Sequence, residues 1–315
     1  MSDATLSPGL APAPIPVAAA RKVRRNSHDE RAAWGLTAPT AVLMAILLVA
    51  PTLAIFALSL TDAELGSSDW RFIGLDTYRD LLSDRTFLTS IRNTAVYVAI
   101  VTPVSVALGL GLALLIEAEV GLKSVFRSIY FLPVVSLTVA MATVWQYLMH
   151  PVIGPINLLA KMLGLPMLNW LGSSDTVLIA LALIGIWQSV GFNMVLFLAG
   201  LTAINRELYQ AAEIDGAKSA LDRFRLVTWP MLGPTTLFVV TIQMINAVKV
   251  FETVATLTQG GPGKASEVLL YTIYEEGFVY LHTGVASAMA VAFIAVLVVL
   301  LIIQTRVLDK RVHYS

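Results

Sequence analysis

Two long apolar segments of the chain carry polar side chains at positions where a solute can be bound. Amides and hydroxyls donate and accept hydrogen bonds, and a lysine adds a positive charge. Polar groups inside a membrane are costly and therefore mark candidate solute pathways. The candidates are Trp187, Gln188, Phe192 and Asn193 in the first segment and Gln243, Asn246 and Lys249 in the second.

Clusters of residues typical of enzymes are missing from the sequence. The chain has no cysteine, which excludes thiol chemistry, disulfides and Cys-based metal sites. Its four histidines are scattered, with no pair at metal-ligand spacing. No GxxxxGK[ST] sequence occurs, so the chain has no Walker motif for ATP. The net charge of zero suggests no nucleic-acid partner. An intramembrane enzyme would need paired His, Asp or Ser–Lys groups, and none is visible.

Composition predicts an all-α membrane protein. The 315 residues are 57% hydrophobic and 13% charged, whereas soluble domains carry about 25% charge. Helices satisfy their own backbone hydrogen bonds in lipid, and about 20 apolar residues cross the hydrocarbon core. Six uncharged runs reach or approach this length and predict a polytopic bundle of six transmembrane helices. They are Leu36–Leu60, Ala95–Ile116, Ile129–Met149, Val177–Ile204, Met231–Val248 and Val285–Ile303.

Charge distribution predicts the orientation. If the N-terminus is cytoplasmic, 14 of the 21 Lys and Arg residues lie on the inner side, 6 lie outside, and Lys249 lies within the fifth helix. The positive-inside rule therefore places both termini in the cytoplasm. The first 20 residues are rich in Ala, Pro and Ser. We therefore expect residues 1–30 to be a disordered cytoplasmic tail and residues 31–315 to be the membrane domain. The short fifth run is expected to continue as a helix through Lys249 toward Val254.

A polar loop separates the fourth and fifth apolar runs. It contains Tyr209-Gln210-Ala211-Ala212-Glu213-Ile214-Asp215-Gly216-Ala217 and ends at Trp229-Pro230. Good helix formers precede Gly216, which can end a helix in a left-handed conformation. A second helix is expected from Ala217 to Thr228, stopped near Pro230. Small alanines allow close approach to a partner, and Asp215 and Arg223 can supply charge-assisted hydrogen bonds.

Several separate patches share a pattern with one known family. Besides the polar loop, they are Phe72–Leu82, Asn93-Thr94, Thr258-Gln259-Gly260-Gly261-Pro262-Gly263 and Arg311-Val312-His313-Tyr314. Together they resemble permease subunits of carbohydrate ABC importers, which take up sugars and glycerol phosphate. In that family the loop motif usually begins Glu-Ala-Ala and ends Leu-Pro. Here Gln210 and Trp229 replace the Glu and the Leu, and the stretch from Gly216 to Pro230 is one residue longer.

The resemblance implies a set of partners. The loop would be a cytoplasmic coupling helix that docks into an ATPase, which supplies the ATP and Mg²⁺ site; this chain would hold no cofactor. The complete importer would contain a second homologous permease, two ATP-binding subunits and a periplasmic solute-binding protein. It would lie among the lipids of a bacterial cytoplasmic membrane. The implied coupling residues are Gln210, Ala211, Ala212, Asp215, Gly216 and Arg223.

Related sugar permeases hold their solute on the fourth and fifth helices. By analogy, Trp187 and Phe192 can stack on a sugar ring while Gln and Asn side chains bind its hydroxyls. Helix–helix hydrogen bonding, worth about 1 kcal/mol, is the alternative for each amide. Lys249 can attract an anionic group, but pairing with Glu252 or extension to the surface is favoured. An ion-coupled secondary transporter is the alternative function, although it would require acidic residues within the spans.

Overall fold

The structure, a computed structural model, describes residues 27–118 and 121–309. It divides after Leu53 into two compact units, which are described separately.

Within the described residues the regular structure is helical, apart from one isolated β-bridge between Thr61 and Phe72. The longer helices are α1 (Ser27–Met44), α2 (Ala50–Leu58), α3 (Asp76–Ser83), α4 (Arg85–Ala118), α5 (Lys123–Val135), α6 (Thr138–Leu148), α7 (Pro155–Met162), α8 (Val177–Thr202), α9 (Arg206–Ile214), α12 (Gly233–Val248) and α15 (Thr283–Asp309). Shorter pieces are η1 (Ala45–Val49), α10 (Ala220–Arg223), η2 (Phe224–Thr228), α11 (Trp229–Met231), α13 (Glu252–Leu257), α14 (Leu269–Tyr274) and η3 (Glu275–Val279).

The first unit consists of helical residues up to Leu53. Its helix belongs to an apolar run, Trp34–Leu58, that is long enough to cross a membrane. The apolar side chains of this run are largely exposed in the single chain, as expected for a surface that faces lipid. Most of the predicted tail, residues 1–26, lies outside the described residues. Residues 27–30, also assigned to that tail, form the first turn of α1.

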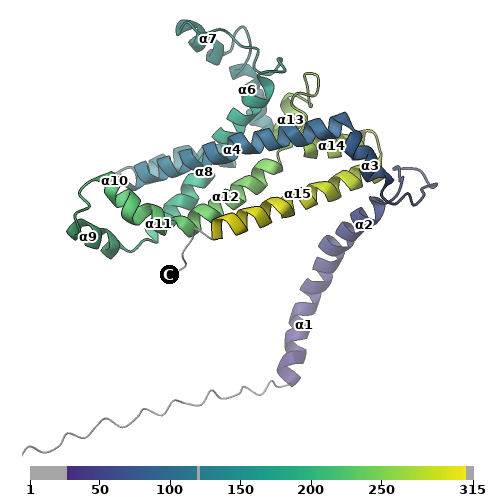
Figure 1. Ribbon diagram of the computed structural model, residues 1–315, viewed down its shortest axis with the longest axis horizontal. Coiled ribbons are helices and arrows are strands. Elements are labelled where there is room, and N and C mark those ends of the chain that lie inside the picture. Colours follow the sequence, from purple (N-terminus) through teal and green to yellow (C-terminus); the bar gives the residue numbers. More distant parts are fainter. Residues whose placement is uncertain (1–26, 119–120, 310–315) are drawn as a thin grey trace, which may run out of the picture. The chain divides into compact units, whose positions relative to one another are not determined.

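The second unit is organised around α4 and α8, which pack along each other, with α5 and α12 against α8 (Figure 1). One end of the unit contains Arg206–Met231 and is called the α9 end below. There Ala113 and Ile116 of α4 share an apolar cluster with Ala212 of α9. The opposite end contains Thr258–Tyr274 and is called the α14 end. There Phe87 of α4 shares another cluster with Leu269.

Five helical segments are long and apolar enough to cross a membrane: Trp34–Leu58, Arg85–Ala118, Val177–Thr202, Gly233–Leu257 and Thr283–Gln304. They confirm five of the predicted spans. The span extends beyond Lys249 to Leu257 as expected. The prediction of one helix continuing through Lys249 is wrong, because α12 ends at Val248 and α13 begins at Glu252.

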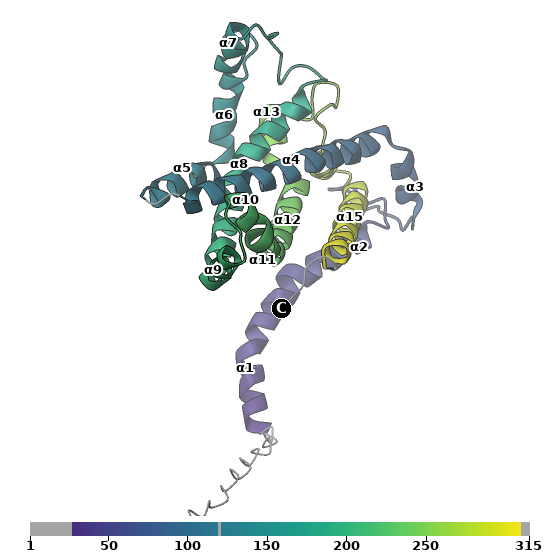
Figure 2. The same ribbon diagram turned by 60° about the vertical axis from the view of Figure 1, so that its left-hand side comes forward.

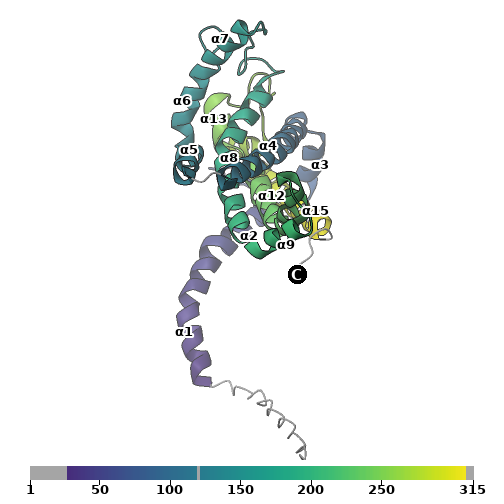
Figure 3. The same ribbon diagram turned by 90° about the vertical axis from the view of Figure 1, so that its left-hand side faces the viewer.

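The third predicted span, Ile129–Met149, is not one continuous helix. It consists of α5 and α6, which meet at an angle of 98°. Pro133 lacks an N–H group, and the Ser136 hydroxyl donates a hydrogen bond to the Pro133 carbonyl at 2.7 Å. The backbone is extended at Ser136, so the helix ends and restarts in a new direction. Figures 2 and 3 show α6 and α7 leading away from α5 and α8.

At the α14 end, side chains of α4 hold the loop that contains the Gly-Gly-Pro-Gly sequence. The Asn93 amide donates hydrogen bonds to the carbonyls of Lys264, Ala265 and Glu267 at 3.2, 3.2 and 2.9 Å. The Thr94 hydroxyl accepts a hydrogen bond from the Leu269 N–H at 2.9 Å. Two patches that are far apart in the sequence thus form one structural element.

Candidate functional site

A cavity of about 350 Å³ lies between the broken third span, α8 and α12. Four of the predicted solute-binding residues line it: Gln188, Phe192, Gln243 and Asn246. Phe192 presents an aromatic ring, and the three amides present donors and acceptors. The Gln243 amide is positioned by donating a hydrogen bond to the Ser189 hydroxyl at 3.1 Å. The cavity therefore combines an apolar face with hydrogen-bonding groups, as small-molecule binding sites do.

A second cavity, of about 420 Å³, continues from the first. The two share Thr138, Gln188, Ser189 and Gln243 as lining residues, so they are neighbouring parts of one hollow. Lys249 lines the second cavity beside the interruption between α12 and α13. The hollow is thus bordered by two helix interruptions, one in the third span and one in the fifth. Irregular backbone at membrane depth is tolerated where it lines a cavity or is buried in protein.

Two predicted solute-binding residues lie outside both cavities. Asn193 is fully buried and donates a hydrogen bond to the Ser105 hydroxyl at 3.2 Å. It therefore connects α8 to α4, the alternative role considered for such amides. Trp187 packs edge-on against Trp145 of α6, with ring centroids 5.4 Å apart. Its ring stabilises the position of α6 next to α8.

Sequence reasoning missed the contribution of the third span. Pro133, Val134, Ser136 and Thr138 line the first cavity at the break between α5 and α6. The signal was present, because a proline followed by a serine interrupts this apolar run. Gly191 of α8 lets α5 approach closely: a Cβ atom there would overlap the Tyr130 carbonyl. A small residue on α8 is thus required to bring the break up to the cavity.

At the α9 end, the predicted turn is formed as expected. Gly216 has φ of +99°, a left-handed conformation that favours glycine. The Ala217 N–H donates to the Ala212 carbonyl at 2.9 Å, and the Gly216 N–H donates to the Glu213 carbonyl at 3.2 Å. These two hydrogen bonds form a Schellman motif, with an apolar contact between Ala212 and Ala217 in the same cluster. The prediction that Gly216 ends the first loop helix is confirmed.

The second loop helix differs from the prediction. It begins at Ala220 because Ser219 and Asp222 form a capping box there. It then continues through a π-helical turn, η2, and through Pro230 to Met231. The helix thus ends at Met231, one residue beyond Pro230, which agrees with the expected stop near Pro230. The Trp229 N–H donates to the Phe224 carbonyl five residues earlier, and such a turn accommodates one additional residue. The extra residue noted in this stretch therefore fits without a break in the helix.

The chain matches the family described as "Binding-protein-dependent transport system inner membrane component" over residues 35–314. The match includes both the hollow and the α9 end. The chain belongs to this permease family.

Relatives of the permease agree with this assignment. It is 30% identical to the sn-glycerol-3-phosphate transport system permease protein UgpA of Agrobacterium fabrum, over 89% of this chain and 95% of the relative. It is also 30% identical to the trehalose/maltose transport system permease protein MalF of Thermococcus litoralis, over 82% and 88%. A crystal structure of a bacterial alginate ABC transporter, in complex with an alginate pentasaccharide-bound periplasmic protein, has a similar fold. That similarity has a TM-score of 0.78 at 21% identity and covers 89% of this chain and 94% of the other.

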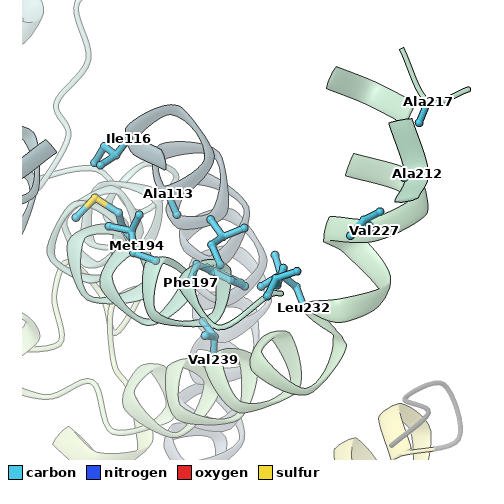
Figure 4. Close-up of a cluster of buried hydrophobic side chains, with 12 residues drawn as sticks. Ala113, Ile116, Met194, Phe197, Ala212, Ala217, Val227, Leu232 and Val239 are labelled. Carbon is cyan, nitrogen blue, oxygen red and sulfur yellow. The ribbon is translucent and has the colours of Figure 1, made fainter. Parts of the chain in front are cut away.

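Within the permease, the predicted coupling residues occupy two faces of the α9 end. Ala212 faces inward, in the cluster that extends through Val227 and Leu232 toward Phe197 (Figure 4). Gln210, Ala211, Asp215 and Gly216 are exposed.

Two larger apolar side chains of α9 are also exposed. Leu208 is 39% exposed and Ile214 is 86% exposed, a distribution suited to contact with a partner. Arg223, predicted to bond at a partner's edge, instead forms an ion pair with Glu213 at 2.8 Å. That pair links the two loop helices to each other.

Proposed function

We propose that this permease forms one half of the translocation pathway of an ATP-driven importer for a sugar or sugar derivative. The observation that supports this most strongly is the hollow between the broken third span, α8 and α12, where Gln188, Phe192, Gln243 and Asn246 meet. Aromatic stacking combined with amide donors and acceptors suits the apolar faces and hydroxyl groups of a sugar. The relatives named for sn-glycerol-3-phosphate and for trehalose and maltose support the same solute class.

The other half of the pathway is supplied by a second, homologous permease. Two ATP-binding subunits hold ATP and Mg²⁺, and each contacts the α9 end of one permease. An extracellular binding protein delivers the solute, and both termini of this chain are cytoplasmic. The apolar cluster that connects Ala212 of α9 through Leu232 to α8 and α12 supports the proposed contact of the ATPase with the α9 end. A displacement of α9 by the ATPase is transmitted to the two helices that line the hollow.

Reconstitution tests this function. The permease, its partner permease, the ATPase and the binding protein are placed in liposomes with a panel of radiolabelled sugars. We expect uptake that requires ATP and stops when this chain is omitted. Uptake driven by a proton or sodium gradient without ATP would contradict the proposal and support the ion-coupled alternative. Uptake by this chain alone would also contradict it.

A further inference from the structure

Lys249 occupies the interruption in the fifth span. It follows the last residue of α12, and the backbone departs from helical geometry at Phe251, where φ is −147° and ψ is −60°. Its exposed side chain lines the second cavity together with Gln188 and Gln243. The interruption thus places an ammonium group on the wall of the hollow.

This ammonium group forms no ion pair within the described part of the chain. The pair with Glu252 that the sequence suggested is absent, since no such contact forms between these two described residues. Among the described residues that line the two cavities, Lys249 is the one with a cationic side chain. A cation within a membrane span is costly and marks a functional position. Its free charge is therefore available to a solute.

Glu252 also lines the second cavity, so an anion there meets one positive and one negative group. Glu252 lies in the first turn of α13. A carboxylate accepts hydrogen bonds from hydroxyl groups. The two charged residues can thus recognise different parts of one solute, the lysine an anionic group and the glutamate a hydroxyl.

We propose that Lys249 selects a solute carrying an anionic group, a phosphate or a carboxylate on a polyhydroxylated body. This rests on the proposed function of the permease. The anionic group contacts Lys249 and the hydroxyls contact Glu252 and Gln188, in the cavity that Gln243 also lines. Phosphate and carboxylate share the chemistry that Lys249 recognises, and the choice of probes distinguishes them.

The test uses the complete importer in liposomes with four probes: glycerol 3-phosphate, a hexuronic acid, and the matched neutral compounds glycerol and a hexose. We expect ATP-dependent uptake of at least one anionic probe, and which one is taken up distinguishes phosphate from carboxylate. Lys249→Gln should lower kcat/KM for that probe at least tenfold, while Lys249→Arg retains most of it.

Co-purification of the ATPase verifies that each variant assembles. If Lys249→Gln does not assemble, Lys249→Met is used in its place. Uptake of neutral probes alone by the unmodified importer would overturn the proposal. A change of less than twofold in uptake of the anionic probe when Lys249 is replaced by Gln would also overturn the proposal. Both results would leave the importer function intact. If neither these probes nor any sugar of the panel described above enters with ATP, the proposed function itself fails.

Discussion

The two ends of the second unit are held together by different kinds of contact. At the α9 end, hydrogen bonds join residues close in sequence, as in the Schellman motif at Gly216 and the capping box of Ser219. At the α14 end, Asn93 and Thr94 bind backbone groups more than 170 residues away. Local hydrogen bonds therefore fix the turns of the α9 end, and apolar contacts join it to α4 and α8. The α14 end also has local hydrogen bonds, but its loop backbone is in addition held by polar side chains of α4.

The largest effect is expected at the α9 end. Gly216→Val places a β-branched residue at φ of +99°, which costs about 1–3 kcal/mol of backbone strain. A Cβ atom there meets nothing within 4 Å, so strain alone changes the angle of the turn. We expect normal membrane insertion, loss of ATPase association by more than tenfold and no uptake, measured by co-purification and transport.

Gly216→Asn is the matched control for this change. Asparagine tolerates the left-handed conformation far better than valine, so ATPase association should be largely retained. Equal loss in both variants would show that the side chain at this position matters rather than the backbone. Normal ATPase association and normal uptake in Gly216→Val would show that the α9 end is not the coupling element.

A smaller and local effect is expected at the α14 end. Asn93→Ala removes three hydrogen bonds to loop carbonyls, and an unsatisfied buried group costs about 1–3 kcal/mol. Residues 258–268 should exchange amide hydrogens at least tenfold faster, while the ATPase still co-purifies.

Thr86→Ala serves as the control at this end. It removes one exposed hydrogen bond from Lys264, at 2.8 Å, and should change exchange in the loop far less than Asn93→Ala. Unchanged exchange in Asn93→Ala would mean that the loop keeps its shape without α4, and the contrast between the two ends would be lost.

The smallest effect is a dependence of the α14 end on pH. Burial, with the nearby Glu275 carboxylate, raises the pKa of Glu267 from 4.5 to about 7, against the opposing influences of Thr272 and Lys264. The folded protein therefore retains this proton more strongly than the unfolded chain does. The resulting stabilisation is complete below pH 4.5 and is lost as the pH rises through about 7.

Hydrogen exchange of residues 267–275 at pH 5 and pH 8, corrected for intrinsic rates, measures this dependence. The unmodified protein should be less protected at pH 8. Glu267→Gln should show nearly equal protection at both values, because an amide does not titrate in this range. An equal pH dependence in the variant would assign the effect to another group.

Local signals predicted the α9 end better than the rest of the site. Gly216 was recognised as a helix end because one residue type suffices for a left-handed turn. The start of the second loop helix at Ala220 was missed, although Ser219 and Asp222 form a capping box three residues apart. The continuation through Pro230 depends on a π-helical turn that residue preferences alone do not specify.

Contacts between distant residues were not predictable from one sequence. Hydropathy detected the third span but not its bend, because the direction of α6 depends on packing such as Trp145 against Trp187. Spacing of three residues favoured an ion pair between Lys249 and Glu252, but that spacing aligns side chains only within a continuous helix. The interruption after α12 removes this alignment. The same interruption brings Lys249 to the cavity.

The central claim is that solute passes through the hollow lined by the broken third span, α8 and α12. The natural absence of cysteine allows a direct test. Asn246→Cys places a thiol on the cavity wall, and Asp69→Cys places one in an exposed loop. The rate of modification by a water-soluble thiol reagent is measured in the assembled importer, with and without a transported solute.

We predict that solute slows modification of Asn246→Cys at least fivefold and leaves the modification rate of Asp69→Cys unchanged. Equal rates with and without solute at Asn246→Cys, in an importer that transports normally, would contradict the account.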